Sequence, residues 1–229
     1  MHAVQAQSSS SSSNPEPQGQ ESAQQPPQQN RPAVSVQARI RARREQRRAA
    51  AIREVYSHLY EAYLGMGYLR FTLPKPLQRM NEYAWDTGLT RYYNERLGVT
   101  LDARGIYGTA YVYNNGSNVF TPAVSQYAVL GGPTYRFYLQ PRYSIAGRVM
   151  AGWTKGNFSG DANGIPINLT HLYPDANTYA IEGSVLFEYN LGPNLGLRVA
   201  PNYYATGFGS SYQNGYGFTG GIVYRFGKQ

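Results

Sequence analysis

Hydrophobic and polar residues alternate along the chain from residue 58 onward, and this is the period of β-strands. In the last such segment Tyr224 and Phe226 belong to the apolar face, and Arg225 lies between them on the other face. We predict eight strands, at 58–71, 82–93, 97–113, 125–139, 144–154, 178–190, 195–206 and 215–226. The alternation therefore predicts an all-β domain over residues 58–229.

The connections between these strands alternate in length. Those after the second, fourth and sixth strands have three or four residues, whereas the others are longer, at 72–81, 114–124, 155–177 and 207–214. Short turns that alternate with long loops are typical of an up-and-down antiparallel barrel. The strands have 11 to 17 residues, and a tilted membrane crossing needs about 9–11. We expect an eight-stranded antiparallel up-and-down transmembrane β-barrel.

Aromatic residues are concentrated near the ends of the predicted strands, and aliphatic residues or Gly occupy the middle of the same face. Two aromatic girdles around an aliphatic band are typical of a barrel in a bilayer. The girdle near the short turns is predicted to contain Tyr92, Tyr93, Phe137, Tyr143, Phe187, Tyr189, Tyr224 and Phe226. The girdle near the long loops is predicted to contain Tyr68, Phe71, Tyr111, Tyr113, Trp153, Tyr179, Tyr203 and Tyr216. A soluble ligand-binding barrel is the rival class, and it would carry its charges outside.

Charged residues occupy the minority face, which the barrel would turn inward. Five acids match five bases there: Glu61, Asp86, Asp102, Glu182, Glu188, Arg104, Arg136, Arg148, Arg198 and Arg225. The interior of an eight-stranded barrel is only wide enough for side chains, and an isolated buried charge costs several kcal/mol. We therefore predict an ion-pair network that closes the lumen, with charges around trapped water as the alternative.

The N-terminal part has a different composition. Residues 1–34 contain six consecutive serines and a Gln/Pro-rich run, which predicts a disordered tether. Residues 35–57 predict a basic helix with Ser35 as its cap and seven arginines: Arg39, Arg41, Arg43, Arg44, Arg47, Arg48 and Arg53. The absence of interleaved aromatic residues disfavours specific nucleic-acid binding. A solvated helix, and contact with anionic lipid, peptidoglycan or a periplasmic partner, remain open.

Composition adds three constraints. The net charge of +8 divides equally between residues 1–54 and 55–229, so basicity is concentrated in the short N-terminal run. The chain has no Cys, which removes disulfides and thiolate metal sites, and we expect no cofactor and no metal. The printed start has no apolar leader core, yet Val4 and Ala6 fit the −3 and −1 positions of a signal cleavage site, so we expect a leader upstream.

Residues 58–229 resemble the small outer-membrane barrels of the OmpA/OmpX type and the related porin-like family of outer-membrane β-barrels. The most specific match is an insertion signal in the last strand: a polar residue, Gly two positions later, and aromatics at the sixth and eighth positions. Thr219, Gly221, Tyr224 and Phe226 fit it, although Gly227 and two further residues follow. The resemblance implies a bacterial outer-membrane location, contact with outer-membrane lipid and the barrel-assembly machinery, and periplasmic termini.

The same resemblance implies a structural or interaction role, in envelope integrity or in adhesion and recognition through loop 155–177. A narrow, low-conductance channel is the alternative. Some barrels of this kind modify lipid A with a His beside Ser, Asp or Glu, and His171 lies in the long loop with Ser159, Asp161, Thr170 and Asp175. No recognisable catalytic motif surrounds it, so we expect no enzyme.

Overall fold

The computed structural model describes residues 35–75, 77–112, 120–161, 165–210 and 212–227. Its elements are α1 (Val36–Tyr56), β1 (Tyr60–Phe71), β2 (Met80–Tyr92), β3 (Leu97–Thr109), β4 (Ala123–Leu139), β5 (Tyr143–Asn157), α2 (Ile167–Thr170), β6 (Ala176–Asn190), β7 (Leu195–Thr206), η1 (Phe208–Ser210) and β8 (Gln213–Phe226). The predicted tether, the cleavage-site residues and Tyr113 lie outside the described residues.

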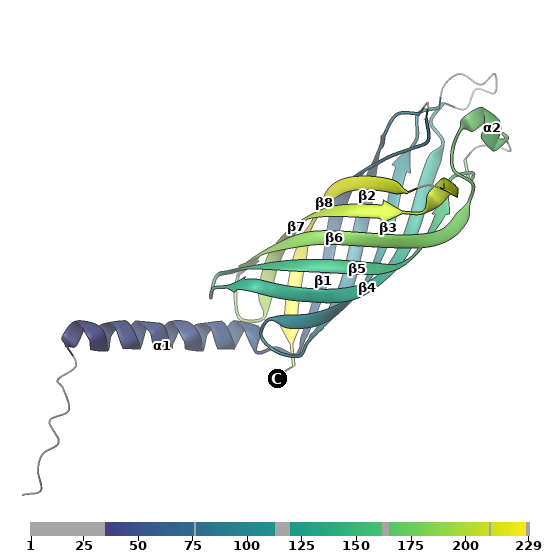
Figure 1. Ribbon diagram of the computed structural model, residues 1–229. Helices are drawn as coiled ribbons and strands as arrows, with labels where there is room; N and C mark the ends of the chain where they lie inside the picture. Colours follow the sequence, from purple (N-terminus) through teal and green to yellow (C-terminus); the bar gives the residue numbers. More distant parts are fainter. Residues whose placement is uncertain (1–34, 76, 113–119, 162–164, 211, 228–229) are drawn as a thin grey trace, which may run out of the picture.

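The eight strands form one closed barrel, in which each strand pairs with the next in sequence and β8 pairs with β1 (Figure 1). All eight pairings are antiparallel. The predicted all-β fold, an eight-stranded antiparallel up-and-down barrel, is therefore confirmed. The largest error in the predicted bounds is in β3, which ends at Thr109 and not at residue 113.

The barrel has two different ends. The turns β2–β3, β4–β5 and β6–β7 lie at one end, which we call the short-turn end, and the longer connections lie at the other, the long-loop end. At the seam between β1 and β8, Tyr60 pairs with Phe226, so α1 and the last strand residue both meet the barrel at the short-turn end. Figure 1 shows α1 projecting from this end and α2 at the opposite one.

Closure of the barrel at this seam depends on glycine. Gly65 of β1 is paired directly with Gly221 of β8. A Cβ atom added at Gly221 would overlap the carbonyl oxygen of Leu64 and the Cα of Gly65. The two strands therefore approach closely because neither residue has a side chain.

The barrel exterior is apolar and carries no strand acid. All six acidic residues of the strands are buried in the lumen, whereas the exposed charged residues of the strands are Arg70, Arg91 and Lys155. Exposed aromatic residues lie towards both ends, for example Tyr143 and Tyr224 at the short-turn end and Trp153 and Tyr179 at the long-loop end. Leu, Val and Ile lie exposed between them, at positions such as Leu64, Leu101, Val149, Ile181 and Ile222.

Two members of the predicted girdles point inward instead. Tyr92 is 1% exposed and Phe71 is fully buried. Tyr92 shares the inward face of β2 with Asp86, and Phe71 shares the inward face of β1 with Glu61, because residues an even number apart along a strand point to the same side. Assignment of these two residues to lipid contact was therefore wrong.

The long-loop half of the lumen is filled by a hydrophobic core. Leu69 and Phe71 of β1, Ile106 of β3 and Leu130 of β4 contribute from the strands. The long connections add the buried residues Leu73, Leu77, Val112, Phe158, Leu172, Tyr173 and Phe208. The described parts of these loops thus pack into this end of the barrel.

Helix α1 begins where the sequence predicts, and its N-cap is Ser35, whose hydroxyl accepts a hydrogen bond of 3.3 Å from the amide of Ala38. The helix is exposed along most of its length, and only Val55 and Tyr56 are buried. None of the described helices combines the length and apolarity that a membrane crossing requires.

Candidate functional site

The ten predicted lumen residues all point into the barrel, and each is at most 4% exposed. Nine of them are joined to one another by ion pairs; the tenth, Asp86, has none among the described residues. The contacts divide into two groups. Residues of β1, β4, β6, β7 and β8 form a cluster near the short-turn end, and residues of β3, β5 and β6 form one further along the lumen.

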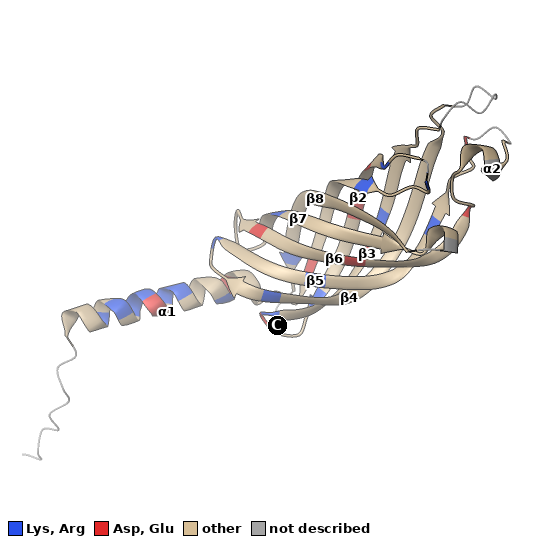
Figure 2. Cartoon of the chain, turned by 45° about the horizontal axis from the view of Figure 1, so that its top comes forward, with Lys and Arg blue, Asp and Glu red and all other residues tan. Residues whose placement is uncertain are grey.

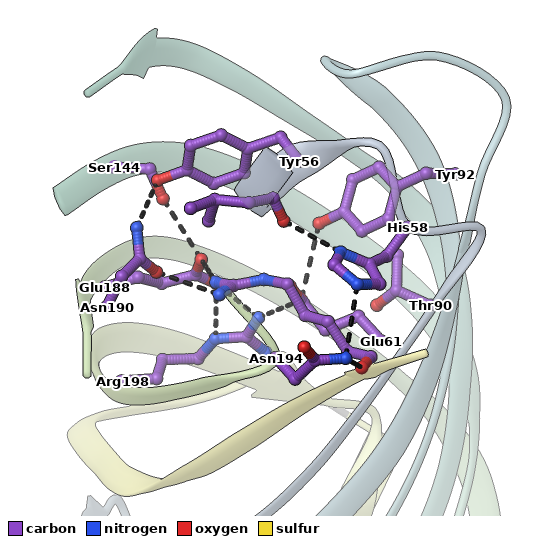
Figure 3. Close-up of polar contacts among 12 residues, drawn as sticks. Tyr56, His58, Glu61, Thr90, Tyr92, Ser144, Glu188, Asn190, Asn194 and Arg198 are labelled. Carbon is purple, nitrogen blue, oxygen red and sulfur yellow. Dashed lines mark hydrogen bonds and ion pairs between the residues drawn. The ribbon is translucent and has the colours of Figure 1, made fainter. Parts of the chain in front are cut away.

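The cluster at the short-turn end contains two carboxylates and three guanidinium groups. Glu61 contacts Arg136 at 2.5 Å, Arg225 at 3.0 Å, and also Arg198. Glu188 contacts Arg225 at 2.7 Å, and also Arg198. Each carboxylate is thus shared between guanidinium groups that approach from different strands. Figure 3 shows Glu61, Glu188 and Arg198 of this cluster below Tyr56.

The second cluster is built around Glu182. Its carboxylate contacts Arg104 at 2.5 Å and Arg148 at 3.2 Å, and Arg104 also contacts Asp102 at 2.8 Å. Arg148 donates a further hydrogen bond of 3.0 Å to the hydroxyl of Tyr63. Arg104 thus contacts Asp102 and Glu182, although its direct neighbour across the β2–β3 pairing is Asp86.

Asp86 is the exception to the predicted network. Its carboxylate is 1% exposed, yet neither oxygen has a hydrogen-bond partner among the described residues. It lies beside a cavity of about 10 Å³ lined also by Arg104 and Tyr204. A cavity of this size holds about one water molecule.

Sequence reasoning missed a sixth inward acid. Glu82 of β2 is fully buried, and it accepts a hydrogen bond of 2.9 Å from the side-chain amide of Gln126. The signal was present, because Glu82 has the same strand parity as Asp86. Its partner is a neutral amide, so Glu82 lies outside the ion-paired clusters.

The most informative residue that the sequence did not reveal is Tyr56, the last residue of α1. It is fully buried, and its ring covers the cluster at the short-turn end (Figure 3). The Tyr56 hydroxyl donates to the Gln140 carbonyl at 3.0 Å and accepts from the Asn190 amide at 2.7 Å. The ring lies 5.0 Å from the guanidinium of Arg136 and 5.4 Å from that of Arg225, within the range of cation–π contacts. We call Tyr56 the stopper of the lumen.

The segment that follows the stopper is also fixed to the rim. His58 lies between α1 and β1, and its Nδ1 is 3.0 Å from the Val55 carbonyl oxygen. Its Nε2 is 3.3 Å from the side-chain amide of Asn194, in the β6–β7 turn. Asn194 donates to the Arg225 carbonyl at 2.9 Å. The exit of α1 is thus held by two strand turns and the last strand.

The predicted insertion signal spreads over three environments. Thr219 faces the lumen and is 8% exposed, and Gly221 lies at the seam with β1. Tyr224 and Phe226 face outward and stack on each other, with ring centroids 6.1 Å apart, and Phe226 also stacks on Tyr60 at 5.6 Å. The signal therefore coincides with the strand that closes the barrel.

The seven arginines of α1 lie outside the lumen, and all are exposed. Figure 2 shows basic residues along most of the helix and few acidic ones. Within α1 the acidic residues are Glu45 and Glu54. The two sets of arginines, those of α1 and those of the lumen, therefore have opposite environments.

In the described part of the long loop, His171 lies on the surface and Asp175 makes its hydrogen bonds to other residues. His171 is exposed and has a φ of 55°. Asp175 instead accepts hydrogen bonds from the amides of Phe158 and Ser159, at 2.7 and 2.9 Å, and from the Ser159 hydroxyl. Burial raises the pKa of Asp175, but these three hydrogen bonds outweigh it and hold the pKa below its usual value. The Asp175 carboxylate thus stabilises the loop. Among the described residues, no group of three or more potential metal ligands occurs.

Comparisons with known proteins identify the fold. No protein-family model and no curated protein matches the sequence. Among solved structures, Neisserial surface protein A (NspA) matches with a TM-score of 0.52 and 11% identity, over 73% of this chain and 97% of that chain.

Two further matches have lower scores. The outer membrane protein OprG of Pseudomonas aeruginosa has a TM-score of 0.47 and 11% identity, over 75% of this chain and 97% of that one. Ail, the attachment invasion locus protein of Yersinia pestis, has a TM-score of 0.45 and 14% identity, over 72% of this chain and 99% of that one. Together with the closed topology, the likeness to NspA shows that this chain has the fold of the small eight-stranded outer-membrane β-barrels.

Proposed function

We propose that this protein is an integral barrel of the bacterial outer membrane with a sealed lumen, and that it has a structural and interaction role. Its barrel anchors two features, the packed loops at the long-loop end and the basic helix at the short-turn end. The short turns and both termini are periplasmic in this proposal, and the long loops face the outside.

The observation that carries the proposal is the filling of the lumen. At the short-turn end Tyr56 covers an ion-paired cluster, in which Glu61 and Glu188 are shared among three arginines. Further along, the cluster around Glu182 crosses the lumen, and the hydrophobic core fills the long-loop half. A channel requires a continuous polar path, and this arrangement supports a closed anchor.

The exterior supports the membrane location. A bilayer accepts an apolar band and aromatic residues at its interfaces, and it strongly disfavours charges near its centre. The strand charges that face outward are Arg70, Arg91 and Lys155, each near a strand end, and no strand acid accompanies them. A soluble barrel would have the reverse arrangement, with its charges spread over the exterior.

Two measurements test the proposal. The full chain should remain with membranes until detergent is added and should show a heat-dependent shift on a gel; release without detergent would contradict the membrane location. Folded protein in a planar bilayer should give no stepwise conductance, with a channel-forming barrel as the positive control. Reproducible conductance steps that persist in independent preparations would contradict the sealed lumen and support the channel alternative.

A further inference from the structure

We propose that α1 binds the phosphate groups of anionic lipids in the membrane leaflet next to the short-turn end, and that the stopper Tyr56 holds the helix in place for this contact. The inference rests on the proposed function, because it requires the barrel to lie in a membrane. It assigns a ligand class to a surface that lies entirely outside the lumen.

The first argument is charge. Helix α1 carries seven arginines and two glutamates, a net charge of +5 within 21 residues, and all seven arginines are exposed. Arg39, Arg43 and Arg47 recur every four residues, so they lie along one side of the helix. A guanidinium group donates two parallel hydrogen bonds to a phosphate and stays charged at any physiological pH. A helix with seven exposed arginines is therefore suited to bind a surface that presents many phosphate groups.

The second argument is position. Because Tyr56 is buried against Arg136 and Arg225, the last turn of α1 cannot move away from the barrel rim without uncovering the lumen. Only three residues separate α1 from β1, and His58 among them contacts Asn194 of the rim. The helix thus remains within its own length of the rim, about 30 Å for 21 residues.

The third argument is the direction in which α1 leaves. The Tyr56 hydroxyl donates to Gln140 in the β4–β5 turn, and the Gln140 side chain donates to the Tyr138 hydroxyl at 3.1 Å. Tyr138 stacks on Tyr143, with centroids 5.7 Å apart, and both are exposed on the barrel exterior. Arg48 of α1 is close enough to interact electrostatically with both phenols. Exposed tyrosines at a barrel end mark the headgroup level, so the middle of α1 lies near that level.

Other ligands fit the helix less well. No aromatic residue precedes Tyr56 in α1, so bases have nothing to stack on. The apolar residues Ile40 and Ile52 do not form a continuous stripe, which indicates adsorption by charge and not insertion among acyl chains. An acidic protein or a cell-wall polymer would need to compete with a membrane surface that is already next to the helix.

The test uses the full chain folded into bilayers. Because the sequence has no Cys, the Ala50→Cys variant can carry one nitroxide label, and Ala50 lies on the same side of α1 as Arg39 and Arg43. The label is compared in phosphatidylcholine bilayers with and without about one third phosphatidylglycerol. We expect anionic lipid to remove the fast component of the spectrum and high salt to restore it, since salt screens exposed charges.

A charge-depleted variant replaces Arg41, Arg43, Arg44 and Arg47 with Gln. Its label should no longer respond to anionic lipid, whereas its heat-dependent gel shift should be unchanged. In a second variant, Tyr56→Ala, the label should be mobile without anionic lipid. A larger fraction of phosphatidylglycerol should be needed to immobilise it to the same degree as in the labelled chain that keeps Tyr56. A spectrum that is indifferent to phosphatidylglycerol overturns the inference. So does immobilisation by soluble acidic polymer or peptidoglycan fragments but not by anionic bilayers. Failure of the barrel to enter bilayers at all would contradict the proposed function itself.

Discussion

The ion-paired cluster predicts that Glu61→Gln destabilises the barrel much more than the same carboxyl-to-amide change at Asp86. Both carboxylates face the lumen and are 1% exposed. Glu61 contacts three arginines. Asp86 has no hydrogen-bond partner among the described residues, and its interactions with Arg104, Arg148 and Arg198 are all at longer range. The two substitutions therefore separate the effect of ion pairing from the effect of burial.

The magnitude follows from the contacts of Glu61. Two unit charges about 4 Å apart attract each other by about 4 kcal/mol at an effective dielectric constant of about 20, so three contacts give about 12 kcal/mol before desolvation and the repulsion by Glu188 are subtracted. Desolvation cancels several kcal/mol for each ion, and removal of one partner from a buried pair typically costs about 3–5 kcal/mol. We expect a loss of about 3–5 kcal/mol for Glu61→Gln. For Asp86→Asn we expect less than about 1 kcal/mol, because no contact is broken and an amide is easier to bury than a carboxylate.

The assay is urea-induced unfolding of the protein in lipid bilayers, followed by the heat-dependent gel shift and by the fluorescence of Trp85 and Trp153. The quantity compared is the free energy of unfolding at equilibrium. Equal losses for the two variants would refute the reasoning, because burial alone would then explain both. A smaller loss for Glu61→Gln than for Asp86→Asn would refute it more strongly.

A double substitution tests whether the contact itself is responsible. The ion pair of Arg136 is with Glu61, so Arg136→Gln in the Glu61→Gln background removes a guanidinium that has already lost its partner. The combined loss should be smaller than the sum of the two single losses by about 0.5–3 kcal/mol, which is the range for residues in contact. Additivity within about 0.5 kcal/mol would show that the two residues act independently.

Three further predictions concern the stopper, the seam and the long loop. Tyr56→Ala should destabilise the folded protein by about 3 kcal/mol in urea unfolding, and Tyr56→Phe by about 1 kcal/mol, since it loses only the hydroxyl contacts. Gly221→Val should lower the fraction that refolds to the heat-shifting form, whereas Gly183→Val, with no atom within 4 Å of an added Cβ, should not. Asp175 has a lowered pKa, so protection of the Ser159 amide from hydrogen exchange should persist from neutral pH to about pH 4. The protection should be lost as pH falls through that lowered pKa. The Asp175→Asn variant should lack the protection at pH 7.

Much of the fold was predictable because strand parity and turn length are local properties of the chain. A short turn fixes which residues of two neighbouring strands face each other, so the pairing of Glu188 with Arg198 across the β6–β7 turn follows from the sequence. Strand parity also predicts the inward orientation of Tyr92, Phe71 and Glu82. Aromatic character favours an outward position for Tyr92 and Phe71, but their parity places them inward, and Glu82 has the same parity as Asp86.

The contacts across the lumen were not predictable in the same way. Glu61 and Arg136 lie on β1 and β4, which are not hydrogen-bonded neighbours. Whether they meet depends on the stagger of all the strands between them, and barrel closure sets that stagger. Asp86 shows the limit of pairwise reasoning: its neighbour Arg104 is held by Asp102 and Glu182 instead. The sequence did not indicate that Tyr56 enters the lumen. Tyr56 belongs to α1, and only the last turn of this helix is buried against the barrel.

The separation of charge leads to a final prediction that links the two sites. The five acids and five arginines of the predicted network cancel one another in the lumen, whereas α1 alone carries +5 of the net charge of +8. The lumen should therefore control stability, and α1 should control contact with anionic surfaces. Replacing Arg41, Arg43, Arg44 and Arg47 with Gln should leave urea unfolding unchanged within about 0.5 kcal/mol, as for exposed positions in general.

The reciprocal measurement is the response of a label at Ala50 to anionic lipid. Glu61→Gln should leave that response intact under conditions in which the barrel is folded, because Glu61 is buried below the stopper and does not contact the exposed part of α1. If Glu61→Gln abolished the lipid response of a folded barrel, the lumen cluster and the helix would be energetically coupled through Tyr56, which contacts Arg136 and Arg225 of the same cluster. The lumen cluster and α1 would then not be independent, as their separate charges led us to expect, and Tyr56 would transmit changes from the cluster to the helix.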